Sequence, residues 1–216
     1  MSVFKYFYAK QFFNYTLLII LTVIMCIVLH ELGHYVSAKM LGYQPTLHYN
    51  KVSFENDINF ENLAKNTSVE VKRKIQRDKI IWNIAGPIIT ILLGTIGFVL
   101  LLIKHSKKYF FNNFSIFYFL LSLNWLRQII VLLQSLMSLI IGRKSHSDDL
   151  VIDYIIQLPP LTFSLITGIL SFFLFSFTIF KLIPITHRLT LFLSVALGGS
   201  IGSILWLFII GPILLP

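Results

Sequence analysis

The sequence predicts an all-α polytopic membrane protein with about five transmembrane helices and a short polar insert after the first. Two observations support this prediction. Only 12% of the 216 residues are charged and 56% are hydrophobic, whereas charged residues make up roughly 25% of an ordinary soluble domain. The apolar residues also gather in blocks that are long enough to cross a hydrocarbon core of about 30 Å as helices.

Each apolar block has the length of one transmembrane helix. The blocks are 12–41, 80–103, 114–141, 161–182 and 189–214. Pro159, Pro160 and Pro184 lie between blocks, where proline ends a helix. We therefore expect residues 1–216 to form a single membrane domain of an integral, multi-pass protein, and we place it in the cell membrane.

The basic charge of the chain does not indicate a nucleic-acid partner. The formal net charge is +9, but Lys and Arg flank the apolar blocks, where they anchor helix ends near lipid headgroups. A basic stripe with interleaved aromatic residues, as nucleic-acid binding requires, is missing from the polar segments of the sequence. The expected partner of these basic residues is the lipid bilayer.

Cys26 is the single cysteine, which excludes an internal disulfide and a cysteine-based zinc cluster.

The third apolar block is less uniform than the others. Asn124, Arg127 and Gln128 fall in its middle, and a charged residue inside a membrane is costly unless it faces protein, water or an interface. Two interpretations remain open at this point. Either the helix is kinked and lines a polar cavity, or the block consists of two shorter segments.

The sizeable polar segment of the chain is the insert 43–79. Within it, residues 47–54 alternate roughly between apolar and polar side chains, which predicts a short strand or hairpin. Residues 67–70 read Thr-Ser-Val-Glu, a capping box that should begin a helix. We expect this helix to lie along the membrane surface before the second span.

The most specific motif is His30-Glu31-Leu32-Gly33-His34 at the end of the first block. In a helix, His30 and His34 lie on one face one turn apart, so both imidazoles can bind a single Zn²⁺ ion. Glu31 beside them can accept a proton from the attacking water as a general base. The apolar run before the motif supplies the helical context that this interpretation needs.

A zinc site of this type requires a third protein ligand. Glu55, Glu61 and Glu70 all lie in the insert. The first and third blocks run in the same direction, so their C-terminal ends lie at the same side of the membrane, and the acidic residues after the third block come to a comparable depth. We therefore expect Asp148 to be the third ligand, with Asp149 as the main rival and His146 as a weaker one. Asp153 is expected to cap or solvate the next helix.

At this point the chain resembles the site-2 protease family of intramembrane metallopeptidases. The matching residues are His30-Glu31-Leu32-Gly33-His34 in a span, Ala85-Gly86-Pro87 opening the next span and Ser147-Asp148-Asp149 after the third. Two departures stand out. The family commonly has Gly after the third-ligand Asp, where this chain has Asp149. The family's Asn-Leu-x-Pro stretch has its nearest counterpart at 135–138, which lacks both Asn and Pro, and Asn124 is a more distant substitute.

The resemblance implies an endopeptidase that holds one Zn²⁺ ion and cleaves a transmembrane or membrane-proximal segment of a membrane protein substrate. It implies a catalytic core at 12–153, and it leaves 161–214 as accessory transmembrane helices. It further implies that the insert pairs with substrate as an added strand. Tyr49, Val52 and Asn124 are the candidate substrate-binding residues. The alternative function is a non-catalytic metal-binding or transport membrane protein related to such proteases.

Overall fold

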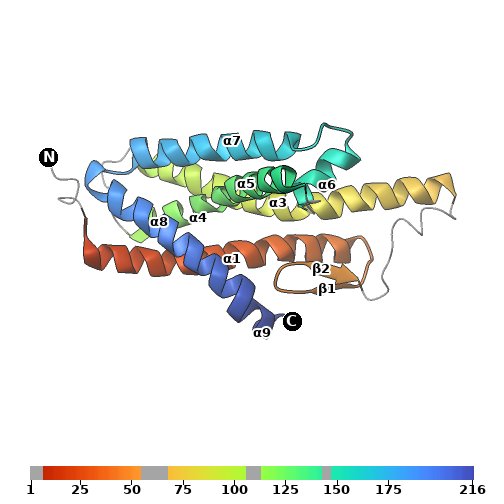
Figure 1. The fold of residues 1–216 in the computed structure, drawn as a ribbon, viewed down its shortest axis with the longest axis horizontal. Helices are drawn as coiled ribbons and strands as arrows, with labels where there is room; N and C mark the ends of the chain where they lie inside the picture. Colours follow the sequence, from red (N-terminus) through yellow and green to blue (C-terminus); the bar gives the residue numbers. More distant parts are fainter. Residues whose placement is uncertain (1–6, 55–67, 106–112, 143–146) are drawn as a thin grey trace.

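The computed structural model describes residues 7–54, 68–105, 113–142 and 147–216, which form a bundle of long helices (Figure 1). The long helices of the first half are α1 (Ala9–Met40) and α3 (Val69–His105). The third span comprises α4 (Asn113–Ser122), the 3₁₀ turn η2 (Leu123–Trp125) and α5 (Leu126–Ile141). The remaining elements are α6 (Asp148–Ile155), α7 (Thr162–Phe177), η3 (Thr178–Leu182), α8 (Ile185–Leu205), η4 (Trp206–Ile210) and α9 (Gly211–Leu214).

Within the described residues, five helices are long and apolar enough to cross a membrane. They are Ala9–Met40, Val69–Lys104, Phe114–Ile141, Thr162–Leu182 and Ile185–Leu214. The predicted fold class is therefore confirmed, and each helix matches one predicted apolar block. Such an arrangement is consistent with a multi-pass integral membrane protein.

The distribution of side chains on α7 is that of a helix in a lipid environment. Its buried residues are small or polar: Ser164, Thr167, Gly168 and Ser171. Large apolar side chains of the same helix are exposed, among them Phe173, of which 64% is accessible. Lipid solvates apolar side chains, so helices in membranes approach one another through small residues and hydrogen bond through polar ones.

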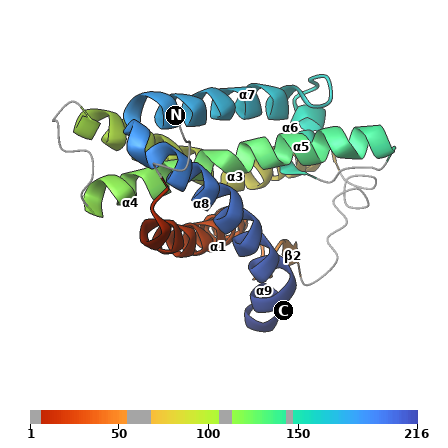
Figure 2. The same cartoon turned by 60° about the vertical axis from the view of Figure 1, so that its left-hand side comes forward.

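Helix α1 is the central element of the packing. It packs against α3 along one side and α8 along the other, while α5 packs on α7 (Figures 1 and 2). A core cluster joins α1, α3, α4 and α8, and it includes Ile19, Leu101, Phe119 and Leu191. The short helix α6 lies against both α3 and α7.

The hairpin predicted in the polar insert is confirmed. Strand β1 (Pro45–Leu47) pairs antiparallel with β2 (Val52–Phe54), with Thr46 opposite Ser53. The backbone amide of His48 donates to the carbonyl of Lys51 and closes the turn at 2.9 Å. The hairpin lies beside the C-terminal end of α1 (Figure 1), because only a short connection separates Met40 from β1.

The structure decides between the two interpretations of the third block and corrects one further expectation. The third block is one span interrupted by η2, rather than two separate segments. The helix that begins at Val69 is continuous with the second span instead of forming a separate surface helix. Neither Gly nor Pro occurs between Val69 and Gly86, so nothing in the local sequence ends the helix there. Thr67 of the capping box lies outside the described residues.

Alanine substitutions at two neighbouring glycines of α8, Gly198 and Gly199, can test the contact between α8 and α1. A Cβ on Gly198 would lie 2.8 Å from the carbonyl oxygen of Thr16, whereas one on Gly199 would meet nothing within 4 Å. We expect Gly198→Ala to lower the free energy of unfolding by about 1–3 kcal/mol, because overpacking separates the two helices. Gly199→Ala should leave it unchanged or raise it slightly. Thermal unfolding in detergent checks this, and equal effects of the two substitutions would contradict the assigned contact.

Candidate metal centre

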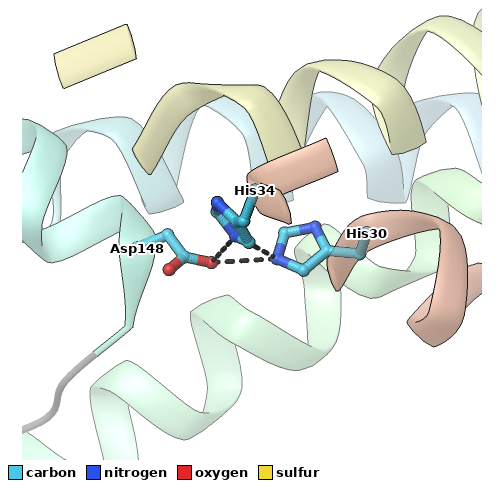
Figure 3. A group of neighbouring side chains, drawn as sticks. All are labelled: His30, His34 and Asp148. Carbon is cyan, nitrogen blue, oxygen red and sulfur yellow. Dashed lines mark hydrogen bonds and ion pairs between the residues drawn. The ribbon is translucent and has the colours of Figure 1, made fainter. Parts of the chain in front are cut away.

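The two histidines of the sequence motif lie on the buried face of α1. His30 is 2% exposed and His34 is 5% exposed. Their rings are nearly perpendicular, with centroids 4.7 Å apart, as expected for positions one helical turn apart. Both Nε2 atoms point toward the first residue of α6 (Figure 3).

That residue of α6 is Asp148, and its carboxylate completes a group of three. Its Oδ2 lies 2.9 Å from Nε2 of His30 and 3.4 Å from Nε2 of His34, and the two nitrogens are 3.1 Å apart. Ligand atoms at the corners of a tetrahedron around Zn²⁺ are about 3.3 Å apart, given metal–ligand bonds of roughly 2.0–2.1 Å. The observed separations therefore fit three corners of such a tetrahedron.

The contacts around His30 also point to a shared cation. An imidazole Nε2 carries either one hydrogen or one lone pair, yet Nε2 of His34 and Oδ2 of Asp148 both lie within 3.1 Å of this one atom. Nitrogen and oxygen atoms that converge in this way are typical of ligands around one ion. The buried group of His30, His34 and Asp148 can thus hold a metal ion.

A backbone carbonyl of α3 orients one of these histidines. Nδ1 of His34 donates to the carbonyl oxygen of Trp82 at 2.8 Å, so Nε2 keeps its lone pair for a metal. Pro87 follows in the same helix, and because proline has no backbone N–H, it removes one backbone hydrogen bond from α3.

The close approach of α3 to the histidines depends on glycine. A Cβ on Gly86 would lie 2.6 Å from Cε1 of His30 and would also collide with His34. On the other helix, a Cβ on Gly33 would lie 2.8 Å from the carbonyl oxygen of Ala85. Both crossing points therefore require residues without a side chain, and this explains why Gly86 is present in the Ala85-Gly86-Pro87 stretch.

The structure distinguishes between the two adjacent aspartates. Asp148 faces the histidines, whereas Asp149 turns to α7 and accepts a hydrogen bond from the Ser164 hydroxyl at 3.1 Å. Burial raises the pKa of the Asp149 carboxyl to about 6. Burial also acts on Asp148, but the neighbouring His30 and His34 outweigh it and hold the pKa of that carboxyl well below its usual range.

Asp153 has the capping role expected from the sequence. Its Oδ1 accepts a hydrogen bond from the backbone amide of Phe163 at 2.9 Å, in the first turn of α7. Asp149 and Asp153 are four residues apart, so both lie on the face of α6 that packs on α7. The weaker ligand candidates His146, Glu55 and Glu61 lie outside the described residues.

Glu31, the candidate general base, follows His30 in α1 and is partly buried. Its carboxyl lies near enough to His34, Asp148 and Arg127 to interact with them electrostatically. The carboxyl therefore lies in the surroundings of the three-residue group.

The predicted substrate-binding residues are held by contacts within the protein. Nδ2 of Asn124 donates to the carbonyl of Leu121 at 2.7 Å. The amide of Tyr49 donates to the carbonyl of Leu215, and its own carbonyl accepts from Nε1 of Trp206. Val52 is buried in β2 opposite Leu47. The backbone N–H and C=O groups of Tyr49 are thus already hydrogen bonded within the protein, and Val52 is paired with Leu47 across the hairpin.

A chain of aromatic rings connects the hairpin to the histidines. The Phe54 ring in β2 lies 5.1 Å from the Trp82 ring, and the Trp82 ring lies 5.9 Å from that of His34. The hairpin is therefore a neighbour of the candidate metal centre.

Arg127 is the site residue that the sequence interpretation missed. Its guanidinium contacts both His30 and Asp148. The signal was an arginine in the middle of an apolar block, which is expensive in a membrane, but sequence alone does not tell which residues it faces.

Comparisons with protein-family models, with curated proteins and with solved structures found no match to this chain. The interpretation of the site therefore depends on its own geometry.

The collision predicted at Gly86 provides a test of the centre. Gly86→Ala should displace the imidazoles and lower the metal affinity by roughly 10- to 100-fold, the usual effect of disturbing residues behind the ligands. Gly94→Ala is the matched control, since a Cβ there would lie 2.6 Å from the Trp125 side chain of the third span instead. We expect this control to affect stability but not metal affinity. Competition titrations with a chromophoric chelator measure both affinities, and equal losses would contradict the prediction.

Proposed function

We propose that this protein is an intramembrane zinc endopeptidase of the cell membrane that hydrolyses a transmembrane or membrane-proximal segment of another protein. The observation that carries the proposal is the convergence of His30, His34 and Asp148 inside a bundle of apolar helices, with Glu31 beside them. The resemblance of these motifs to the site-2 protease family supports it.

The set of ligand atoms favours zinc in a catalytic setting. Two imidazole nitrogens and one carboxylate oxygen are typical zinc ligands, and three protein ligands leave the fourth position open. Zinc held there supplies Lewis-acid chemistry that activates water and polarises a peptide carbonyl. The open position distinguishes such a centre from a structural site, in which four protein ligands close the shell.

Glu31 has the role of general base and acid in this proposal. Its carboxylate takes a proton from the attacking water and later delivers it to the leaving amine nitrogen. Burial among α1, α3 and α6 lowers the local dielectric, so each electrostatic interaction in the site is stronger than in water. The hydrogen bond from His34 to Trp82 maintains the tautomer that presents Nε2 to the metal.

The location of the site indicates the class of substrate. His30 and His34 belong to the first of the helices that are long and apolar enough to cross a membrane, which supports a substrate whose peptide bond reaches the centre in or beside the bilayer. Such a bond belongs to a segment that is itself in or beside the membrane. The hairpin next to Trp82 is the element we expect to pair with an extended substrate segment, with Val52 and Tyr49 nearby and Asn124 in the third span.

The experiment that tests the function separates metal binding from cleavage. Glu31→Gln should retain one zinc ion per chain but abolish proteolysis, because Gln cannot accept the proton of the attacking water. Membrane protein fragments in cells carrying this variant would be compared with those in wild-type cells. Glu70→Gln is the matched control, since Glu70 is exposed at the start of α3, and it should leave the fragments unchanged. Cleavage that survives in Glu31→Gln would refute the mechanism.

The ligand assignment has its own test. Asp148→Ala should reduce zinc affinity by more than about 100-fold, because loss of a direct ligand exceeds the effect of disturbing its surroundings. Asp149→Asn should retain most of the affinity, since its side chain faces Ser164. Zinc content after dialysis against a chelator measures the difference. Retention of zinc by Asp148→Ala together with its loss in Asp149→Asn would reverse the assignment.

A further inference from the structure

Arg127 lies in the first turn of α5, and its guanidinium contacts two of the three proposed metal ligands. One guanidinium nitrogen, Nη2, lies 2.6 Å from Nε2 of His30 and 3.4 Å from Oδ2 of Asp148. These are two of the three atoms that can hold a metal ion. The side chain is 20% exposed, so the cation sits mostly inside the protein.

The other terminal nitrogen of this guanidinium, Nη1, is buried and has no hydrogen-bond partner among the described residues. A buried donor without an acceptor is destabilising, and more so when it carries charge. Arg188, in the first turn of α8, provides a contrast, because its guanidinium donates to the carbonyl oxygens of Ile183 and Phe180. Arg188 thus has a structural role in its helix end, while Arg127 has an unused donor beside the metal centre.

The metal ion and the guanidinium compete for the same lone pair. Nε2 of His30 has one lone pair, so a bound metal takes it and leaves Arg127 without this acceptor. A buried guanidinium then requires an oxygen acceptor close to the metal ligands, preferably a negatively charged one, because charge-assisted hydrogen bonds are the stronger ones. During peptide hydrolysis such an oxygen forms when the carbonyl carbon is attacked.

We propose that Arg127 is a catalytic residue that donates a hydrogen bond to the carbonyl oxygen of the scissile peptide bond and stabilises the negative charge that develops on it. This inference depends on the proposed peptidase function. The water oxygen bonds to the carbonyl carbon while its proton passes to Glu31, and the C=O electron pair moves to the oxygen facing Arg127. When that pair returns, the C–N bond breaks and the amine nitrogen takes the proton from Glu31.

The surroundings of Arg127 suit this role. The side chain comes from α5 and the ligands come from α1 and α6, so the donor is held by a different element from the groups it assists. A donor that is already oriented in a site of low dielectric needs little rearrangement as charge develops. The planar guanidinium, with Nη1 and Nη2 on one side, can donate in parallel to an oxygen and to the Asp148 carboxylate.

The test measures anion binding at the metal, independently of proteolysis. The full-length protein is loaded with Co²⁺, and its visible absorption is titrated with acetate, an oxygen anion, and with imidazole, a neutral nitrogen ligand. We expect Arg127→Gln to weaken acetate binding by roughly 10- to 100-fold and to change imidazole binding by less than about threefold, because only the anion accepts from the guanidinium. Arg127→Lys should give an intermediate loss. Arg188→Gln removes the same charge far from the site and should change neither titration.

The titrations separate the role of Arg127 from the proposed peptidase function. Acetate affinity that is unchanged in cobalt-loaded Arg127→Gln overturns this inference and leaves the zinc peptidase intact. Equal weakening of acetate and imidazole, or loss of cobalt from both Arg127 variants, also overturns it and makes Arg127 a positioning residue for the ligands. A wild-type protein that binds no cobalt overturns the proposed function and this inference together. With a cleaved substrate in hand, Arg127→Gln should lower kcat by about 100- to 1000-fold at similar KM.

Discussion

The close crossing of α1 and α3 is the contact on which the candidate centre depends. Gly33 and Gly86 let the two helices approach until α3 touches the imidazoles of His30 and His34. At this distance the carbonyl of Trp82 can orient His34. Because lipid does not drive apolar surfaces together, close van der Waals packing through small residues is a main source of helix association in a membrane. The contact that holds the helices together is therefore also the one that shapes the candidate metal centre.

Buried polar contacts around α6 complete the arrangement. Asp149 accepts from Ser164 and Asp153 caps the first turn of α7, so two residues of α6 attach its inner face to α7. Unsatisfied polar groups are expensive in an apolar environment, and these pairings restrict how α6 can turn about its axis. The result is that Asp148 projects toward α1. In this way a short helix of eight residues holds its carboxylate in one direction.

Much of the fold follows from local sequence. The spans are predictable because each apolar block is long enough for the bilayer, and the hairpin is predictable because alternation is a local pattern. The direction of the Arg127 side chain, in contrast, is not predictable from the local sequence. The 3₁₀ turn η2 precedes it, and three residues at 3.0 per turn instead of 3.6 rotate the following helix by roughly 60°. The polar residues of the third block indicate an interruption of the helix, but they do not indicate how far it rotates the Arg127 side chain.

The candidate metal centre is likewise predictable from the sequence only in part. The pair His30 and His34 is encoded locally, because a spacing of four residues puts both on one face of any helix. The choice between Asp148 and Asp149 is not encoded in this way. Adjacent residues of a helix point about 100° apart, so either could face α1 if α6 were turned. Packing of α6 on α7 makes the choice, since the groups that bind Asp149 and Asp153 belong to a helix later in the chain.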